Sequence, residues 1–429
     1  HKSNCSEYRK KKKETLLVEL IGIELVAMSQ PKGLEITTLQ TLDTEYCADA
    51  TEWCPIDGFQ DILLCGTYQL QERKASCAAF ERSEEEVIVD FPRNQVRVGR
   101  LFIYQLEKEF LKLQEQLKLD MPGILDIKWS HQLINGRPTF GLVNSVGQLR
   151  VYQFMENQSC SKSDESSMPQ AVPPLSLLCE CHFGADCLGL SLEWSNQLRF
   201  SEPSVAATDS NGFVSLFKVT PAAVEKTCRW KCQDFEAWIT AFNQWDPSLL
   251  YTGGDDCQLK VWDLRIGTDF PVLVSRRHTM GVCSVQSNPI QEHIVATGSY
   301  DEQLCIWDSR QMRRPVQDIG LGGGIWRIKW EPWSGTKILT ATMYSGFHLL
   351  QADSASGAPI DILSQYTKHE SIAYGADWYR WSSNQDVGPC EKKVDSEANP
   401  FSASPAKYLI ATCSFYDHSL HLWEFSPNS

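Results

Sequence analysis

Several aromatic, acidic and histidine side chains stand beside short polar turns in this sequence. Tyr300 and Tyr416 each come directly before a turn aspartate, and His418 comes directly after one. The segments that lead into short apolar stretches supply further residues of the same kinds, namely Glu236, Trp238, Trp326, Arg327 and Tyr374. Aromatic faces beside carboxylates suit a quaternary ammonium group. These residue types therefore favour recognition of a cation, provided that the fold brings them together.

The turns belong to a repeated stretch of sequence. Residues 253–263 return as residues 298–308 and again as residues 414–424, and each copy has an aspartate six residues before a tryptophan. A tight polar turn followed by alternating apolar residues is typical of a β-hairpin. The first two copies lie about 45 residues apart, which matches the period of WD-repeat propellers.

Four further stretches have the same strand pattern with another residue in place of the tryptophan. The seven strands end at Tyr104, Tyr152, Phe217, Trp262, Trp307, Leu350 and Trp423. One blade for each strand predicts an all-β fold, a seven-bladed WD40 β-propeller. By length alone, 429 residues would suggest two or three domains, but one propeller accounts for nearly the whole chain.

The two ends of the repeat region predict how the ring closes. Only four residues follow Phe425, so the last blade has no outer strand of its own. Residues 34–41 have strand character, and we expect them to supply this strand, because an unclosed blade would expose a long edge. The propeller is thus predicted to span residues 34–429. Residues 1–33 are predicted to be a disordered or loosely helical extension whose apolar run is too short to cross a bilayer, so no membrane is expected.

Three insertions interrupt the period, at residues 71–95, 155–174 and 381–405. All are rich in Ser, Glu, Pro or Lys and are predicted to be flexible. The first separates the second and third strands of its blade and should lie on the same face as the polar turns. The other two should lie on the opposite face.

Composition and charge exclude some classes of function. The net charge is −14, and no basic stripe is present of the kind that binds nucleic acid. The 16 cysteines are scattered, mostly within apolar strands, which is typical of a reducing compartment such as the cytoplasm. Cys179, Cys181, His182 and Cys187 are closer together, but their spacing matches no common zinc pattern. We therefore expect no metal and no other cofactor.

Two groups of candidate residues also have a structural alternative. His278, Thr297, Asp301 and Trp307 have the spacing of the hydrogen-bond network that braces a WD repeat. A bracing role for His278 and Asp301 is the more common one, because most polar side-chain networks serve structure. In the fourth blade Gln233 replaces this histidine, and in the seventh Cys413 stands where Ser or Thr is usual, so we expect both of those networks to be interrupted. Likewise, the two tryptophans Trp238 and Trp326 could instead pack between blades.

A more specific resemblance lies in the loops. Residues 235–239, 278–284, 296–302, 326–330, 374–378 and 411–418 resemble the WD-repeat diphthine methyl ester hydrolases, a family also called diphthine methyltransferase. The resemblance covers about residues 34–429. It implies that the chain removes a methyl ester from the modified histidine of elongation factor 2, so that a later enzyme of diphthamide synthesis can amidate the carboxylate.

The implied reaction assigns roles to the candidate residues. The sequence has no Gly-x-Ser-x-Gly, His-Glu-x-x-His or phosphate-binding glycine motif, so direct attack by an activated water is the simplest mechanism. The base would be His278 or His418, oriented by Glu236 or Asp301. Arg327, or the backbone amides after Gly324, would stabilise the oxyanion. The trimethylammonium group would be enclosed by the aromatic residues Trp238, Tyr300, Trp326, Tyr374 and Tyr416.

A non-catalytic scaffold is the rival interpretation. Residues 262–265 and 307–310 fit the Trp-Asp-x-Arg pattern of propellers that serve as substrate receptors of cullin-4 ubiquitin ligases. In that case the partner would be a cullin-4 ligase adaptor rather than elongation factor 2. The pattern is short, and Arg265 and Arg310 could simply pair with nearby carboxylates.

Overall fold

The computed structural model describes residues 35–72, 95–155, 172–184, 186–195, 203–220, 223–353, 357–380 and 407–427. All of them belong to one compact unit, Glu35–Ser429, and within them the secondary structure consists of strands without a helix. No part of the chain described here forms a helix that could cross a membrane. The predicted extension 1–33 and most of the predicted insertions 71–95, 155–174 and 381–405 lie outside the described residues.

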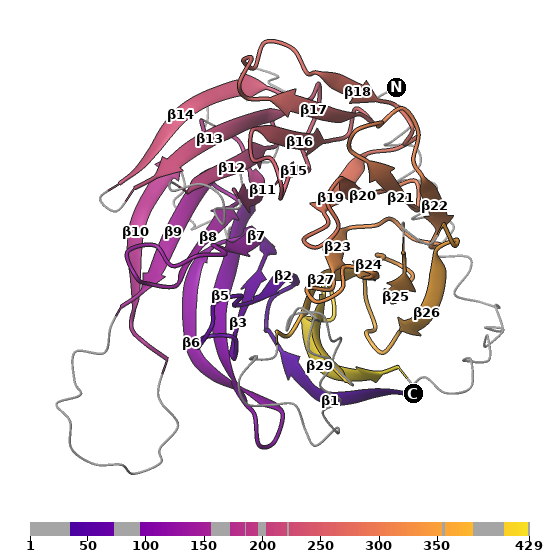
Figure 1. The fold of residues 1–429 in the computed structure, drawn as a ribbon. Helices are drawn as coiled ribbons and strands as arrows, with labels where there is room; N and C mark the ends of the chain where they lie inside the picture. Colours follow the sequence, from indigo (N-terminus) through magenta and orange to yellow (C-terminus); the bar gives the residue numbers. More distant parts are fainter. Residues whose placement is uncertain are drawn as a thin grey trace, which may run out of the picture. The chain divides into compact units, whose positions relative to one another are not determined.

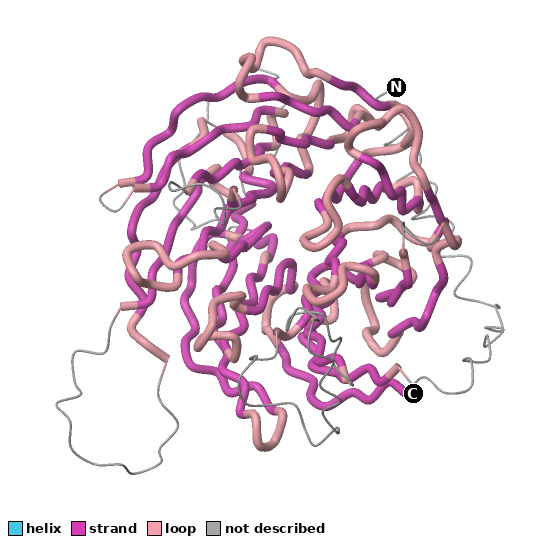
Figure 2. The backbone as a smooth tube through the Cα atoms, in the orientation of Figure 1, coloured by secondary structure: helices cyan, strands magenta, loops and turns pink. Residues whose placement is uncertain are grey.

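Seven antiparallel sheets are arranged around one axis (Figures 1 and 2). Blade 1 contains β2 (Ala48–Trp53), β3 (Ile62–Thr67), β4 (Gln69–Glu72), β5 (Gln95–Glu107) and β6 (Lys112–Pro122). Because β3 and β4 pair with β5 in one continuous register, β4 extends β3 along the same edge. Blade 2 contains β7 (Ile124–Trp129), β8 (Thr139–Asn144), β9 (Gln148–Phe154) and β10 (Leu175–His182). Blade 3 contains β11 (Gly189–Trp194), β12 (Ser204–Asp209), β13 (Phe213–Val219) and β14 (Val224–Lys231).

The remaining four blades have the same order of strands from the axis outward. Blade 4 contains β15 (Ile239–Phe242), β16 (Leu249–Gly253), β17 (Leu259–Asp263) and β18 (Leu273–Ser275). Blade 5 contains β19 (Val282–Ser287), β20 (Ile294–Ser299), β21 (Gln303–Asp308) and β22 (Gln317–Gly320). Blade 6 contains β23 (Arg327–Trp330), β24 (Lys337–Ala341), β25 (Phe347–Gln351) and β26 (Asp361–Tyr366). Blade 7 contains β27 (Ala373–Trp378), β28 (Tyr408–Ser414), β29 (Ser419–Ser426) and, as its outer strand, β1 (Glu35–Asp43).

The seven-bladed propeller and its closure by an N-terminal strand are confirmed. Each predicted strand-terminating residue lies in the third strand of a different blade. The strand β1 pairs with β29 from Glu35↔Ser426 to Asp43↔Ser419. The chain therefore joins its two ends within one sheet, and blade 7 has no unpaired third strand at the ring seam.

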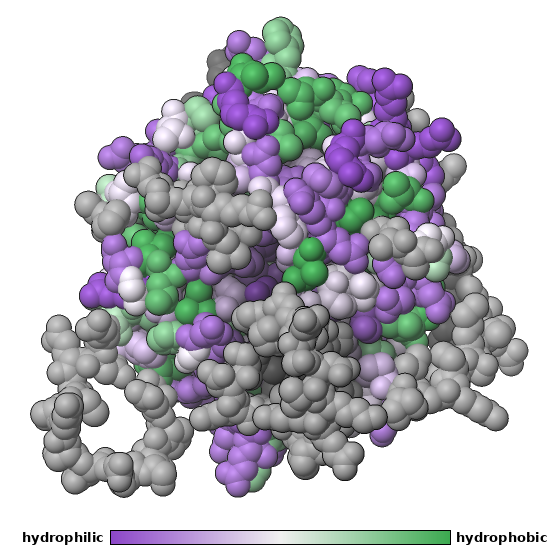
Figure 3. All heavy atoms as spheres, viewed as in Figure 1, coloured by the Kyte–Doolittle hydropathy of each residue, from purple (hydrophilic) through white to green (hydrophobic). Residues whose placement is uncertain are grey.

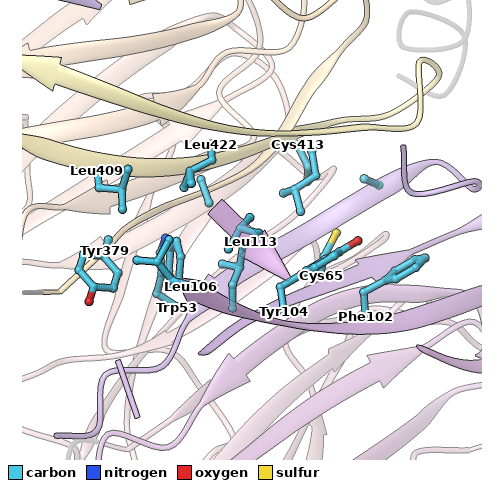
Figure 4. Close-up of a cluster of buried hydrophobic side chains, with 14 residues drawn as sticks. Trp53, Cys65, Phe102, Tyr104, Leu106, Leu113, Tyr379, Leu409, Cys413 and Leu422 are labelled. Atoms are coloured by element: carbon cyan, nitrogen blue, oxygen red, sulfur yellow. The ribbon is translucent and has the colours of Figure 1, made fainter. Parts of the chain in front are cut away.

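Apolar side chains fill the spaces between neighbouring blades. At the seam, Leu409, Cys413 and Leu422 of blade 7 lie against Trp53 and Tyr104 of blade 1 (Figure 4). All of these side chains are at least 98% removed from solvent, with exposed fractions of 0–2%. Burial of this kind stabilises the closed ring by about 25 cal/mol for each Å² of apolar surface that it removes from water.

Tryptophans at the ends of the inner strands fix one blade against the next. The indole N–H of Trp129 donates to the carbonyl of Glu52 at 3.3 Å, and that of Trp194 donates to the carbonyl of Lys128 at 2.9 Å. Trp330 and Trp378 donate in the same way to the preceding blades. This explains why the inner strands β2, β7, β11, β23 and β27 all end on tryptophan, since the residue is buried there and, in the last four, hydrogen-bonded to the preceding blade.

The inner strands share a bulge near the face on which the polar turns lie. Register shifts occur in β2, β7, β11, β19 and β27 at the same place relative to the second strand. In blades 4 and 6 the equivalent residue directly precedes β15 and β23. One residue from each blade thus stands at one level around the axis, and we call these seven residues the bulge ring: Asp49, Leu125, Leu190, Trp238, Cys283, Trp326 and Tyr374. A bulge re-aims a side chain and is common beside active sites.

Candidate active site

Aromatic side chains form a continuous belt at the bulge ring. The ring centroids of Trp238 and Trp326 are 5.5 Å apart, those of Trp326 and Tyr374 are 4.8 Å apart, and those of Tyr374 and Phe415 are 4.9 Å apart. Tyr300 lies 6.2 Å from Trp326. We call this group the aromatic belt: Trp238, Tyr300, Trp326, Tyr374, Phe415 and Tyr416. All five aromatic residues predicted from the sequence belong to it.

Phe415 is the member that the sequence analysis missed. It directly precedes Tyr416, and the two rings are 5.0 Å apart at right angles. Phe415 belongs to the same turn as Tyr416 and could have been identified. Only the residues next to the turn aspartate were considered. It connects the exposed Tyr416 to the rest of the belt through Tyr374.

The belt is accessible from outside. Trp238, Tyr300, Trp326 and Tyr374 are half-buried, and Tyr416 is 68% exposed. Side chains that only fill the space between blades would be buried as completely as Trp307 or Trp423, which are 0% exposed. Trp238 and Trp326 do pack against rings of other blades, as the structural alternative expects, but unlike Trp307 and Trp423 they keep part of their surface exposed. Figure 3 shows one face of the molecule, with a hollow near its centre surrounded by hydrophilic residues.

Neighbouring groups fix the orientation of the belt. The indole N–H of Trp238 donates to Asp255 Oδ1 at 2.7 Å. A Cβ at Gly281 would lie 2.6 Å from the same oxygen and 3.1 Å from Cδ2 of Tyr300. A Cβ at Gly324 would lie 3.2 Å from Cδ1 of Tyr300. Glycine at both positions thus leaves room for the tyrosine ring between two blades.

Asp49 is an acidic member of the bulge ring that the sequence analysis did not identify. It lies on β2, is 5% exposed, and its Oδ1 has no hydrogen-bond partner among the described residues. Burial raises the pKa of Asp49 well above its ordinary value, Arg327 opposes this shift, and Asp126 adds to it. Blade 1 lacks the repeat signature that drew attention to the other loops. Counting back four residues from the terminal tryptophan Trp53 would have placed Asp49 at the level of Tyr374.

Arg327 lies beneath the belt and is engaged in an ion pair across the axis. Its Nη1 is 3.2 Å from Oδ1 of Asp126, and both side chains are buried. Lys128 Nζ also contacts this carboxylate, at 3.0 Å. Although burial alone would raise the pKa of Asp126, Arg327 and Lys128 hold it below its ordinary value. The predicted oxyanion donor is therefore close to the belt but is already neutralised by a carboxylate from the opposite side of the ring.

His278 occupies a structural network. Its Nδ1 lies 3.0 Å from Oδ2 of Asp301, and its Nε2 lies 2.8 Å from Oγ1 of Thr297. Thr297 also accepts the indole N–H of Trp307, at 2.8 Å. With both ring nitrogens engaged and 4% exposure, His278 has no free nitrogen for a water. The geometry favours the bracing role for His278 and Asp301 over the role of base and orienting acid.

The expectation of interrupted networks holds in part for blade 4 and was wrong for blade 7. In blade 4 the amide of Gln233 donates to Oγ1 of Thr252 at 3.0 Å, but its Oε1 has no hydrogen-bond partner among the described residues, so the link to the turn aspartate is missing. In blade 7 the hydroxyl of the network belongs to Thr412 rather than to Cys413, and it lies 2.9 Å from Nε2 of His369. The turn of blade 7 is one residue longer than that of blade 5, which shifts the position of the hydroxyl in the sequence.

His418 and Glu236 lie close in sequence to belt residues, but they do not form the predicted pair of a base and its orienting acid. His418 has a φ of 55° in the turn between β28 and β29, and its carbonyl accepts the backbone N–H of Thr44 at 2.8 Å. Gly212 occupies the same left-handed turn position in blade 3, with a φ of 77°. The carbonyl of Glu236 accepts the N–H of Asp255 at 3.0 Å. Within the described residues, neither side chain makes a hydrogen bond or an ion pair.

The clustered cysteines lie far from a metal-binding geometry. Cys179 and Cys181 point to the same side of β10, with sulfurs 3.7 Å apart. Burial raises the pKa of Cys179 to about 12, which disfavours the thiolate that binds metals. Cys187 is buried against Gly147. In the described ranges, no group of three or more His, Cys, Asp or Glu side chains is placed to hold a metal ion.

The two arginines of the Trp-Asp-x-Arg pattern pair with their own motifs. Arg265 Nη2 is 2.7 Å from Asp263, and Arg310 Nη2 is 2.6 Å from Asp308. Both arginines remain largely exposed, at 59% and 67% of the side chain. The prediction that they could simply pair with nearby carboxylates is confirmed. Because they are exposed, both side chains are accessible to a protein partner.

The bracing role of His278 leads to a stability prediction. We expect His278→Ala to lower the free energy of unfolding by about 1–3 kcal/mol, because Asp301 and Thr297 lose buried partners. The hydrogen bond from His278 opposes the effect of burial and holds the pKa of Asp301 below its ordinary value. This contribution is present above the unfolded pKa, near 3.9, and is lost as the pH falls through the folded pKa, so the difference between variant and parent should narrow in acid. Denaturant unfolding at neutral and acidic pH checks this, and a strong loss of turnover in fully folded His278→Ala would contradict it.

The fold and the networks define the class of this protein. The ring of four-stranded blades braced by Asp, Thr, His and Trp is that of a WD40 propeller, and the family model described as "WD domain, G-beta repeat" matches residues 227–263 and 270–308. The human protein named "Diphthine methyltransferase" is 35% identical over 91% of this chain and 99% of its own length. A Dictyostelium discoideum protein named "Diphthine methyltransferase homolog" is 33% identical over 88% of this chain and 96% of its own length. The chain therefore belongs to the diphthine methyltransferase family.

Two more distant similarities concern the fold and its repeats. A chain in the "Crystal Structure of Mitotic Checkpoint Complex" superposes with a TM-score of 0.59 at 15% identity, covering 94% of this chain and 98% of that one. This similarity shows the propeller fold alone. The Pisum sativum protein named "E3 ubiquitin-protein ligase COP1" is 27% identical over 29% of this chain and 17% of its own length. That match covers only part of the propeller.

Proposed function

We propose that this protein hydrolyses the methyl ester of diphthine methyl ester on elongation factor 2, releasing methanol and leaving the carboxylate that is later amidated to diphthamide. Membership of the diphthine methyltransferase family supports the substrate. The observation that carries the proposal is the aromatic belt, in which half-buried rings lie side by side and the buried acid Asp49 stands at the same level. Such a surface suits the trimethylammonium group of the substrate.

The position of the cation brings the ester close to polar groups. In diphthine the trimethylammonium group and the carboxyl group are attached to the same carbon, so a cation held by the belt places the ester carbonyl beside the bulge ring. Water attack on this carbonyl requires a base and stabilisation of the oxyanion. Asp49 lies at this level, and Arg327 lies beneath it in an ion pair with Asp126. We further propose a cytoplasmic location, which suits the free thiols of the described cysteines.

Mass spectrometry of the substrate tests the reaction. Purified protein is incubated with elongation factor 2 that carries methyl-esterified diphthine, and the modified peptide is weighed. Hydrolysis predicts the loss of one methylene unit without any added methyl donor. An unchanged mass, or a gain of mass that depends on a methyl donor, would refute hydrolysis. The family name describes methyl transfer, so the direction of the change is decisive.

The exposed arginines separate this proposal from the scaffold alternative. We expect the double variant Arg265→Ala/Arg310→Ala to remove the methyl group at the rate of the parent protein. Both arginines form ion pairs with aspartates of their own motifs and with no belt residue. The same assay of methylene loss measures this. If the protein were only a receptor for a cullin-4 ligase adaptor, the double variant would lose adaptor binding in a pull-down, and neither protein would change the mass of elongation factor 2.

A further inference from the structure

We propose that Asp49 is the catalytic base, taking a proton from the water that attacks the methyl ester at the belt. This inference rests on the proposed function and assigns the central chemical role within it. The ring contacts of the described histidines involve His369 and His421 and no belt residue, and within the described residues the ring of His418 has no acid bonded to it that could orient it as a base. His278 has both nitrogens engaged, and His369 bonds to Ser414 and Thr412.

The first support is the position of Asp49 in the fold. It is the extra residue of the β2 bulge, between the paired residues Ala48 and Ala50. Tyr374 is the extra residue of the β27 bulge in the neighbouring blade. Trp326 occupies the equivalent position before β23, where Arg327 pairs with Ala341. The same backbone device that places two belt rings at the axis therefore places this carboxyl among them.

The second support is a pair of unsatisfied atoms. Oδ1 of Asp49 and Nε1 of Trp326 are both buried and both lack a hydrogen-bond partner within the described part of the chain. The indole N–H also lowers the pKa of Asp49 as a hydrogen-bond donor would, so the two groups face each other although their geometry falls outside that of a hydrogen bond. Leaving a buried polar atom unpaired is costly, because the atom has lost its water and gained no partner. An orphaned donor and acceptor at one end of the belt are explained if a water and the ester oxygens bind between them during catalysis.

The third support is the balance of charge. Asp49, at the level of the belt, forms a charged group with Arg327 and Asp126 beneath it, and this group contains two acids and one base. Lys128 further neutralises Asp126. Among the described residues, the other titratable groups that interact with Asp49 are the hydroxyl of Tyr374 and the thiol of Cys413 in the neighbouring blade, and the thiol of Cys47 in its own blade. Burial raises the pKa of Asp49. A trimethylammonium group in the belt adds a positive charge and lowers this pKa, so the substrate itself favours the ionised, basic form.

The proposed reaction is balanced without a further co-reactant. The carboxylate of Asp49 accepts a proton as the water oxygen forms a bond to the ester carbonyl carbon. The resulting tetrahedral oxyanion lies towards Arg327 and the N–H of Trp326. Its collapse breaks the bond between the carbonyl carbon and the methoxy oxygen, and the methoxy group leaves as methanol with the proton from Asp49. The carboxyl group of diphthine then releases the second proton of the water to solvent and becomes the carboxylate, and the carboxylate of Asp49 is restored.

The experiment compares Asp49→Asn with the parent on methyl-esterified diphthine of elongation factor 2. A lost general base lowers kcat by about 100- to 10,000-fold. KM should stay near that of the parent, because the belt still binds the cation. Asp318→Asn is the matched control, since Asp318 lies on β22 in an exposed pair with Arg277, and its turnover should be unchanged. A variant that keeps its kcat, or that raises KM alone, would overturn the assignment and leave the proposed hydrolysis standing.

The fold of the variant is measured at the same time. Asp49 is ionised more easily in the unfolded chain than in the folded one, so it disfavours folding as the pH rises above the unfolded pKa, near 3.9. Asp49→Asn should therefore be at least as stable as the parent at neutral pH, and the gain should vanish in acid. If the variant does not fold, the pH dependence of the parent enzyme tests the assignment instead. The kcat of the parent should fall in acid with an apparent pKa below that of kcat/KM. A kcat/KM that does not change with pH would refute a carboxyl base. A parent that releases no methanol would instead refute the proposed function.

Discussion

Replacing both Trp238 and Trp326 with alanine should raise the KM for the methyl-ester substrate by about 10- to 100-fold. A cation over an aromatic face gains about 0.5–2 kcal/mol, and each 1.4 kcal/mol is a factor of ten in affinity. The two rings lie 5.5 Å apart and remain half-buried, so they are available to a ligand rather than consumed by the core. Steady-state kinetics of methanol release measure the effect.

Two controls distinguish a lost binding surface from a damaged fold. The conservative double variant Trp238→Phe/Trp326→Phe keeps both aromatic faces and should retain most of the affinity. Trp333→Ala removes another half-buried tryptophan, one that packs against Tyr408 with centroids 5.7 Å apart, away from the belt. It should lower stability and leave KM unchanged. An unaltered KM in the alanine double variant would show that the belt does not hold the substrate.

Removing the guanidinium of Arg327 should lower the free energy of unfolding by about 3–5 kcal/mol. Arg327→Ala leaves the buried carboxylate of Asp126 with one cationic partner fewer, and breaking a buried ion pair by removing one member is strongly destabilising. Asp126 also accepts the backbone N–H of Leu192 at 3.2 Å, so its ionised form is built into the fold. Denaturant unfolding of the purified variant gives the value.

The matched control is Arg310→Ala, which breaks an ion pair of similar geometry on the surface. Arg310 contacts Asp308 at 2.6 Å with most of its side chain exposed, and exposed pairs contribute little. A double variant, Arg327→Met/Asp126→Leu, should recover part of the lost stability, because it removes both buried charges together. Equal stability of Arg327→Ala and the parent would mean that the pair across the axis does not brace the ring.

The architecture could be predicted because the repeat has a strict period and a strict register. One strand-terminating residue in each blade predicted the position of every third strand. Because no outer strand follows Phe425, residues from the other end of the chain had to supply it. The belt followed for the same reason. Tyr300 and Tyr416 occupy equivalent turns, and equivalent positions in a propeller share one face.

The rest depended on contacts that no local pattern encodes. Arg327 and Asp126 meet only because the closed ring brings blades 6 and 2 to opposite sides of one axis. Asp49 carries no motif of its own, and its significance comes from the bulge that it shares with Tyr374. The network of blade 7 was misassigned to Cys413 because a one-residue change in turn length moves the hydroxyl to Thr412. In each case the deciding fact was a spatial register between distant strands.

The account is tested most directly by hydrolysis in water enriched in oxygen-18. Elongation factor 2 with methyl-esterified diphthine is incubated with the protein for a single turnover, and the released methanol and the modified peptide are both weighed. Water attack at the carbonyl predicts one heavy oxygen in the diphthine carboxylate and unlabelled methanol. A heavy oxygen in the methanol, or a carboxylate without label, would mean that the methyl group leaves by a different bond cleavage and that the proposed chemistry is wrong.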